Sequence, residues 1–287
     1  MTVPLISVIR EIVRTLRASP LFALALLVTI AAAAFNGAMV SLMVLEIDLP
    51  GPFSQMTHFQ EPGHRVHDLT FGFIFLPAVV GILAQFRRPS KNVANQVMAL
   101  IPSVGLLLTL LLANNTRVLQ PPWVIVGAAA LIAMSLHPAG RGFFRSFSFS
   151  RVNWVMLALV IIAAFPLLVS ASTNIGLQAT ITDDHAAAGH YGFMAAFGFS
   201  VIGIGLLASL RPDGWRITAW VGGLLAALLG LTSLVYPDIT SSLPTMWAIA
   251  ALAWGVGFIT AAEFSKEPRE PGLPGPNAVR RSSTRRQ

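Results

Sequence analysis

The stretch Glu61-Pro62-Gly63-His64-Arg65-Val66-His67-Asp68 leads from a polar loop into the second long apolar segment of the chain. A related stretch, Asp183-Asp184-His185-Ala186-Ala187-Ala188-Gly189-His190, leads into an apolar segment in the second half. At this end of the predicted helices, most polar side chains that could bind a ligand or take part in a reaction belong to these two stretches. They therefore indicate both how the fold is repeated and where a functional site would lie.

The composition is that of a polytopic membrane protein. Only 11% of the 287 residues are charged, 55% are hydrophobic, and the mean hydropathy is +0.71. Soluble domains carry about 25% charged residues, so we predict an all-α protein whose main partner is the lipid bilayer. The net charge of +7 is explained by basic cytoplasmic loops, and no nucleic-acid partner is expected. Because there is no cysteine, disulfides, thiolate metal sites and covalently attached haem are excluded.

Eight apolar runs meet or approach the ~20 residues that a transmembrane helix requires. They are residues 20–46, 67–86, 95–114, 122–137, 153–172, 188–210, 217–236 and 243–264. With eight membrane crossings, Arg65 and Arg117 lie on one side of the membrane, and all the other Lys and Arg residues of the 19 lie on the opposite side. The positive-inside rule therefore predicts a multi-pass protein of the plasma membrane with both termini in the cytoplasm. The first run is too long for a signal peptide and is expected to remain as a helix.

The two halves of the sequence follow the same order of features. A shift of 123 residues places His67 on His190 and Arg88-Pro89 on Arg211-Pro212. We therefore predict two tandem four-helix bundles related by an axis along the membrane normal, with His67 and His190 facing each other. The predicted parts are a cytoplasmic amphipathic segment (residues 1–19), the first bundle (20–145), the second bundle (146–264) and a disordered basic cytoplasmic tail (265–287).

The candidate site combines residues from both stretches. His64 and His67 are three residues apart, and they share a helix face with Glu61. Histidines and carboxylates at such spacing can bind zinc, copper, iron or a haem iron. The predicted metal-binding residues are His64, His67, Asp68, Asp184, His185 and His190.

An alternative interpretation needs no ligand. At the membrane interface these side chains can be solvated loop residues, and Asp68, Asp183 and Asp184 suit helix N-termini. Their equivalent placement in the two halves favours a function. The membrane helices contain no lysine, which excludes a retinal Schiff base, and no series of carboxylates crosses the membrane, which argues against a proton pump.

The motif Glu61-Pro62-Gly63-His64-Arg65 resembles the Glu-x-x-His-Arg motif that opens the second helix of haem A synthases, which are eight-helix proteins made of two four-helix bundles. The resemblance implies that Glu61 is a catalytic carboxylate and that His64 and His190 ligate haem. The family's further histidines on helices four and eight, and its cysteine pair, are missing here. Met246, at the start of the last helix, is the candidate replacement ligand.

The sequence thus predicts a haem- or metal-binding site at the extracytoplasmic face, used for electron transfer or cofactor maturation. The haem-binding candidates are His64, His67, His190 and Met246, and zinc or copper is the alternative to haem. A second hypothesis is a transporter or an accessory subunit of a membrane complex that binds no cofactor. The small number of buried polar residues would then favour an apolar solute or other membrane subunits as partners.

Overall fold

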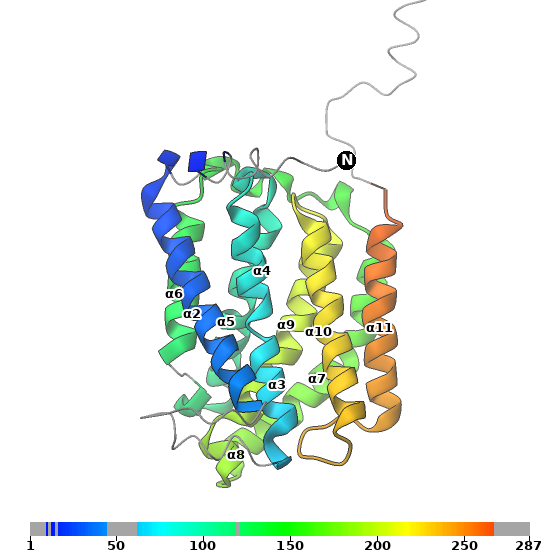
Figure 1. Ribbon diagram of the computed structural model, residues 1–287. Helices are drawn as coiled ribbons and strands as arrows, with labels where there is room; N and C mark the ends of the chain where they lie inside the picture. Colours follow the sequence, from blue (N-terminus) through cyan, green and yellow to red (C-terminus); the bar gives the residue numbers. More distant parts are fainter. Residues whose placement is uncertain (1–9, 11–12, 15–16, 45–61, 119–120, 267–287) are drawn as a thin grey trace, which may run out of the picture.

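A computed structural model describes residues 10, 13–14, 17–44, 62–118 and 121–266. In this part of the chain the secondary structure is entirely helical (Figure 1). The longer helices are α2 (Pro20–Val44), α3 (Arg65–Phe73), α4 (Leu76–Gln85), α5 (Val93–Ala113), α6 (Pro121–Ser135), α7 (Trp154–Thr180), α9 (His190–Leu210), α10 (Trp215–Val235) and α11 (Thr245–Glu263). Short helices connect them: η3 (Pro62–His64), η4 (Pro89–Lys91), η5 (Thr116–Val118), η6 (Gly140–Ser146), η7 (Phe149–Arg151) and α8 (Asp184–Ala187).

Seven segments of the described chain are long and apolar enough to cross a membrane, and α3 and α4 together form one of them. The count becomes eight if α6 and η6, which are bent by 100° relative to each other, are taken as one span. This is where the expected eight spans are least regular, because α6 has only 15 residues. By contrast, α7 continues to Thr180, well beyond the predicted end at residue 172.

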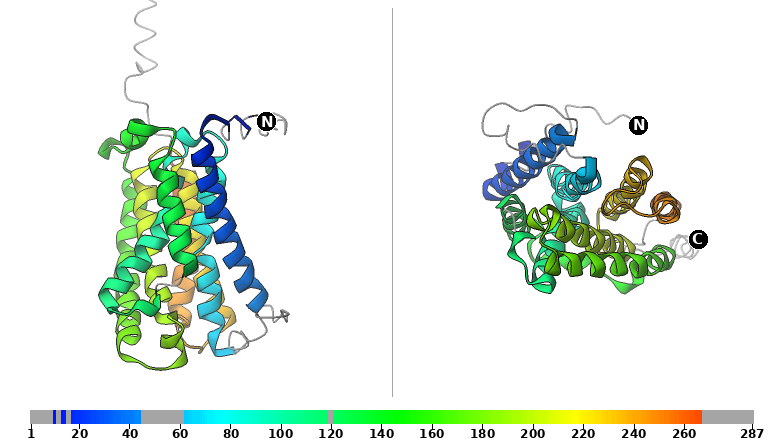
Figure 2. Two further views of the ribbon diagram at one scale, coloured as in Figure 1. Left: turned by 90° about the vertical axis from the view of Figure 1, so that its left-hand side faces the viewer. Right: turned by 90° about the horizontal axis from the view of Figure 1, so that it is seen from below.

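Helix α9 lies at the centre of the bundle and packs against α3, α5, α7 and α10 (Figure 2). It is the most buried span, with 72% of its most apolar window buried, whereas only 17% of the corresponding window in α7 is buried. Apolar side chains on α7 such as Ile162 and Phe165 are exposed. An outer helix with this surface is suited to contact with lipid.

Small residues bring α10 and α11 into close contact. A Cβ atom placed on Gly230 would lie 2.4 Å from the carbonyl oxygen of Ala248, and one placed on Gly223 would lie 2.7 Å from that of Gly255. Larger side chains would therefore force the two backbones apart. Close approach through small residues is a common means of helix association in membranes.

Most basic residues of the described chain, though not Arg65 and Arg117, belong to segments at the end of the bundle where α2 begins and α11 ends; Figure 1 shows these two helix ends on the same side. Here Arg216 donates hydrogen bonds to the carbonyl oxygens of Ala262 and Ser265, at 3.0 and 2.8 Å, and Arg211 donates to that of Lys266 at 2.9 Å. Cationic side chains near the last carbonyl groups stabilise a helix C-terminus. The start of α3, the helix α8 and the α10–α11 connection lie at the opposite end (Figure 1).

The histidine that ends the fourth apolar run also lies at the basic end. This residue, His137, would suit a helix cap or a lipid headgroup contact by its position in the sequence, but its side chain is buried. The Nε2 atom lies 3.1 Å from Oε1 of Gln85, and Nδ1 accepts a hydrogen bond from the backbone N–H of Ala139. This histidine therefore has its ring nitrogens satisfied within the protein and is structural.

Candidate metal centre

Four histidines from both halves of the chain meet at the end opposite the basic residues. His64 ends η3, His67 lies in the first turn of α3, His185 lies in α8, and His190 begins α9. The ring of His185 stacks on that of His64 with a centroid distance of 4.2 Å, and the ring of His190 stacks on that of His67 at 5.0 Å. The expectation that His67 and His190 face each other agrees with this packing.

Three of these side chains present nitrogen atoms suited to one metal ion. One ring nitrogen from each of His64, His185 and His190 lies within 4.8 Å of the other two. A tetrahedral zinc ion with Zn–N distances of about 2.0–2.1 Å needs such nitrogens about 3.4 Å apart. Modest side-chain rotations would therefore bring the three imidazoles onto one ion.

The site is largely enclosed. His64 and His67 are each 2% exposed and His190 is 5% exposed, whereas the side chain of His185 is 17% exposed. Polar side chains of loop residues usually remain in contact with water. Several buried imidazoles at one place are therefore not what simple solvated loops would show. His185 is therefore the histidine of the cluster that is most accessible from the surface.

Local sequence explains how His185 and His190 are placed next to each other. Asp183 accepts a hydrogen bond from the backbone N–H of Ala186 at 2.8 Å and so caps α8. Gly189 then turns the chain with a φ of +79°, which favours glycine. A Cβ atom at this position would also lie 2.9 Å from the carbonyl oxygen of Arg117. The turn therefore needs glycine both for its conformation and for its close packing.

Gln178, near the end of α7, holds this turn in place through two hydrogen bonds of its side-chain amide. Its Nε2 atom donates to the carbonyl oxygen of Ala186 at 2.8 Å, and its Oε1 atom accepts from the N–H of Gly192 at 3.0 Å. The side chain is 1% exposed, so both hydrogen bonds are shielded from water. Gln178 thus joins the residue after His185 to the first turn of α9.

Asp183 also faces His185 with its second carboxylate oxygen. This Oδ2 atom lies 3.8 Å from Nδ1 of His185 and accepts a hydrogen bond from the hydroxyl of Tyr191 at 2.9 Å. Desolvation raises the pKa of Asp183, but the hydrogen bonds from Ala186 and Tyr191 outweigh it, so the pKa lies below its usual value. The other ring nitrogen of His185, Nε2, is buried and has no hydrogen-bond partner among the described residues.

His67 has a different partner. Its Nε2 atom lies 2.8 Å from the Oγ atom of Ser241, in the connection between α10 and α11. Its ring also contacts that of His185 at a centroid distance of 5.0 Å. The α10–α11 connection therefore reaches the histidine cluster through this hydrogen bond.

An aromatic layer closes the bundle side of the site. The rings of Phe75 and Trp123 stack with a centroid distance of 4.0 Å, and those of Phe71 and Phe193 meet edge to face at 4.7 Å. These rings pack against one another, and Phe75 and Trp123 are almost completely buried. Phe71 follows His67 by four residues on α3, and Phe193 follows His190 by three on α9, so these two rings lie about one turn further into the bundle than the histidines.

Of the remaining predicted site residues, Asp68, Asp184 and Met246 lie in the described part of the chain, and none of them belongs to the group of three histidine nitrogens. Asp68 is buried on α3, 2% exposed, but is not among the residues whose ligand atoms come together. Asp184 is exposed on α8. Met246 is 77% exposed on α11, which is the surface expected of a lipid-facing side chain. Glu61 lies outside the residues that the structure describes.

Sequence reasoning missed three residues that support the histidines: Gln178, Tyr191 and Ser241. Tyr191 had a usable signal, because it is one of only two tyrosines and directly follows His190. Gln178 lies beyond the predicted end of the fifth apolar run at residue 172, and its contacts depend on the turn that follows. Ser241 carried no signal, because it is brought to His67 only by the packing of α3 against α10.

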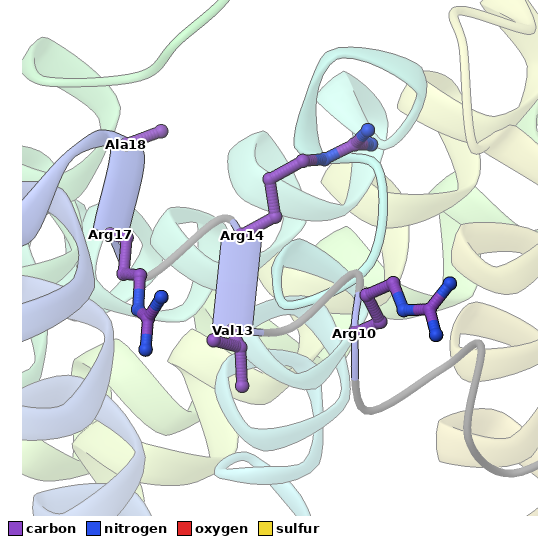
Figure 3. A pocket seen from close by; sticks show the side chains of 5 residues that line it. All are labelled: Arg10, Val13, Arg14, Arg17 and Ala18. Atoms are coloured by element: carbon purple, nitrogen blue, oxygen red, sulfur yellow. The ribbon is translucent and has the colours of Figure 1, made fainter.

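A second feature lies at the basic end of the molecule. Arg10, Arg14 and Arg17 line an open depression of about 510 Å³ beside Val13 and Ala18, just before α2 (Figure 3). All three arginines are exposed. Exposed guanidinium groups beside a membrane-spanning helix are suited to anionic lipid headgroups, but they form no enclosed site.

Comparisons of the chain with models of protein families, with curated proteins and with solved structures found no match. The interpretation of the site therefore depends on its own geometry.

Proposed function

We propose that this protein binds a transition-metal ion of the zinc or copper class at the end of the bundle opposite its basic residues. His64, His185 and His190 are the ligands. The observation that carries the proposal is the set of three imidazole nitrogens within 4.8 Å of one another, contributed by the two halves of the chain. Neutral imidazole is a preferred ligand of both ions.

The surroundings of His185 support this assignment. A histidine that ligates a metal usually directs its other ring nitrogen to a carboxylate or a carbonyl group. Nδ1 of His185 faces the carboxylate of Asp183 at 3.8 Å, and the buried Nε2 is the atom left for the ion. The Tyr191 hydroxyl holds the same carboxylate in place at 2.9 Å.

The packing favours a single ion over haem. Two axial histidines lie on opposite faces of the flat macrocycle. Here the rings of His64 and His190 meet edge to face and those of His67 and His190 stack, each pair with a centroid distance of 5.0 Å, which leaves no layer between the expected haem ligands for a porphyrin. The rings of Phe71, Phe75 and Phe193, which could line a pocket for a macrocycle, pack against each other and against Trp123 instead. Haem binding would require all of these rings to separate.

Of the two tasks expected for such a site, we favour the handling of an ion for cofactor maturation on the predicted extracytoplasmic side. Three imidazoles leave one coordination position for an incoming or departing ligand. His185 connects the site to the surface, so an ion can be received from outside the membrane. Electron transfer would require copper, because zinc has no redox chemistry under biological conditions.

We also infer that the two halves are copies of one four-helix unit. Arg88 and Arg211, which correspond under the shift of 123 residues, both adopt left-handed backbone conformations before a proline, with φ of 53° and 52°. Thr218 donates to Asn95 at 3.2 Å, and these two residues are themselves 123 apart. Corresponding residues that contact each other lie near a pseudo-twofold axis. Such an axis would pass between Asn95 and Thr218 at one end and between His67 and His190 at the other.

The test is metal analysis of the purified protein, together with zinc titration and an absorption spectrum of the same sample. We expect one equivalent of zinc or copper in the wild type, and none after replacement of both His64 and His190 by alanine. His137→Gln is the control, because it removes a histidine at the opposite end of the bundle. Equal binding by all three proteins would refute the site. If the wild type showed the absorption spectrum of haem, we would conclude that the site binds haem and not a single ion. A metal-free, colourless wild type would favour the transporter or accessory-subunit hypothesis.

A further inference from the structure

His67 belongs to the histidine cluster, but it is not among the three residues whose ligand nitrogens lie within 4.8 Å of one another. Its ring nevertheless contacts two of those three residues, with centroid distances of 5.0 Å to both His185 and His190. The side chain is almost completely buried. His67 therefore borders the proposed ion site without belonging to its closest set of ligands.

The two ring nitrogens of His67 have different surroundings. Nε2 lies 2.8 Å from the Oγ atom of Ser241, whereas Nδ1 is buried and has no hydrogen-bond partner among the described residues. A neutral imidazole has one N–H group and one lone pair, and the hydrogen bond made by one nitrogen decides the state of the other. If Nε2–H donates to Ser241, the lone pair is on Nδ1. A nearby cation favours this tautomer, because the other one would place an N–H group on the unpartnered nitrogen.

The position of Ser241 does not depend on His67. The neighbouring Ser242 donates its backbone N–H to the carbonyl oxygen of Ile239 at 3.0 Å. Ile239 and Leu243, on either side of Ser241, both pack against the hydrophobic core. Ser241 is therefore a fixed point that can hold both the orientation and the tautomer of the His67 ring.

We propose that Nδ1 of His67 accepts a hydrogen bond from a water molecule that fills the fourth coordination position of the ion. This inference rests on the proposed metal site and names what occupies its open position. Three protein ligands and one water are the usual coordination of zinc sites that keep an exchangeable position. The water would give the buried Nδ1 atom the partner that it lacks within the protein.

The lengths of the two bonds agree with the place of His67 beside the ligand set. A zinc–oxygen distance of about 2.0–2.2 Å followed by a hydrogen bond of about 2.8 Å puts the accepting nitrogen about 4–5 Å from the ion. A direct ligand would have to lie at about 2.0–2.1 Å. His67 can therefore serve through a water molecule while its hydrogen bond to Ser241 stays intact.

This arrangement also selects among ions. A divalent ion polarises its bound water and makes it a strong hydrogen-bond donor, whereas singly charged copper favours sulfur ligands. The site is therefore matched to zinc or to divalent copper that carries one water. A ligand that replaces this water keeps His67 satisfied only if it donates a hydrogen bond, so anions without a hydrogen atom are disfavoured.

The first test counts ligands by X-ray absorption of the zinc-loaded protein. We expect three imidazoles and one oxygen ligand in the wild type and in His67→Phe, which keeps a flat ring at this position. Four imidazoles in the wild type, or one fewer in the variant, would make His67 a direct ligand and overturn the proposal while the metal site stands. If wild-type protein binds no zinc, the metal site has failed and this inference with it.

The second test uses thiocyanate, titrated into the cobalt-loaded protein and followed by visible absorption. Thiocyanate can replace the bound water but cannot donate a hydrogen bond, so in the wild type it must break the contact with His67. We expect its affinity to rise about two- to tenfold in His67→Phe. Ser241→Gly, which suits the φ of 66° and removes the hydroxyl, should give a smaller rise.

His137→Gln is the control, because this histidine lies at the opposite end of the bundle, and it should keep the wild-type affinity for thiocyanate. A change of fold stability alone would not raise the affinity of the bound cobalt for an anion. Equal thiocyanate affinities in all four cobalt-loaded proteins would contradict the role of His67.

Discussion

Replacement of Asp183 by asparagine should weaken metal binding while leaving the fold intact. Asparagine keeps an oxygen that can accept the hydrogen bond from the Ala186 amide, which is 2.8 Å long in the wild type, so α8 should remain capped. The second oxygen becomes an NH₂ group that cannot accept a hydrogen bond from Nδ1 of His185. The orientation of His185 towards an ion is then no longer favoured.

The size of this effect follows from the geometry. Loss of a carboxylate that orients a metal-bound histidine typically weakens affinity about 10- to 100-fold, equivalent to about 1.4–2.7 kcal/mol. The distance of 3.8 Å between Asp183 and His185 is longer than a hydrogen bond, and the Asp183 side chain is 41% exposed. Solvent screening reduces such an interaction. We therefore expect a loss of about tenfold, at the lower end of that range.

The assay is competition of the purified protein with a zinc chelator, performed for the wild type, Asp183→Asn and Asp184→Asn. Asp184 is the matched control, because it is adjacent, carries the same charge and is exposed on α8. Its replacement should change affinity by less than about twofold, as expected for a screened surface charge. Equal losses in the two variants would show that net charge, and not the orientation of His185, controls binding, and would refute this reasoning.

Three further predictions concern stability and packing. Gln178→Met should destabilise the protein by about 1–3 kcal/mol, because it leaves the buried N–H of Gly192 without its hydrogen-bond partner, and thermal unfolding in detergent measures this loss. Gly230→Ala should cost about 1–3 kcal/mol through overpacking against α11, whereas Gly257→Ala, whose Cβ would meet nothing within 4 Å, should be neutral or slightly stabilising in the same assay. Thr218→Val should lower the melting temperature by an amount that is absent when Asn95→Leu is already present, because both changes remove the same hydrogen bond; additive losses in this double-mutant cycle would contradict direct coupling.

The apolar runs were sufficient to predict most helices, because the requirement for about 20 apolar residues per span is strict. The fourth run was the exception. There, residues 122–137 are apolar but fewer than about 20, α6 ends at Ser135, and the chain bends by 100° between α6 and η6. Composition does not reveal such a bend. The buried contact of His137 with Gln85, which helps to secure this region, depends on a residue 52 positions away in the sequence.

The candidate site was partly predictable for a similar reason. Equivalent positions in two repeated segments suggested that His67 and His190 would meet, since a pseudo-twofold axis brings equivalent positions together. Symmetry could not assign roles within the cluster. His67 is engaged by Ser241, whereas His64 joins His185 and His190, because the connections outside the repeated helices differ in the two halves. Helix spacing alone also placed Asp68 with the histidines, although its side chain is not part of the group.

The distribution of the histidines over both halves has a consequence for biosynthesis. His64 and His67 leave the ribosome and reach the membrane well before His185 and His190 are synthesised. The three-nitrogen group needs His185 and His190, so it forms only after α9 has been inserted beside α3. A partly made or truncated chain therefore has no complete site with which to capture an ion, and loading with metal would report that the whole protein has been assembled.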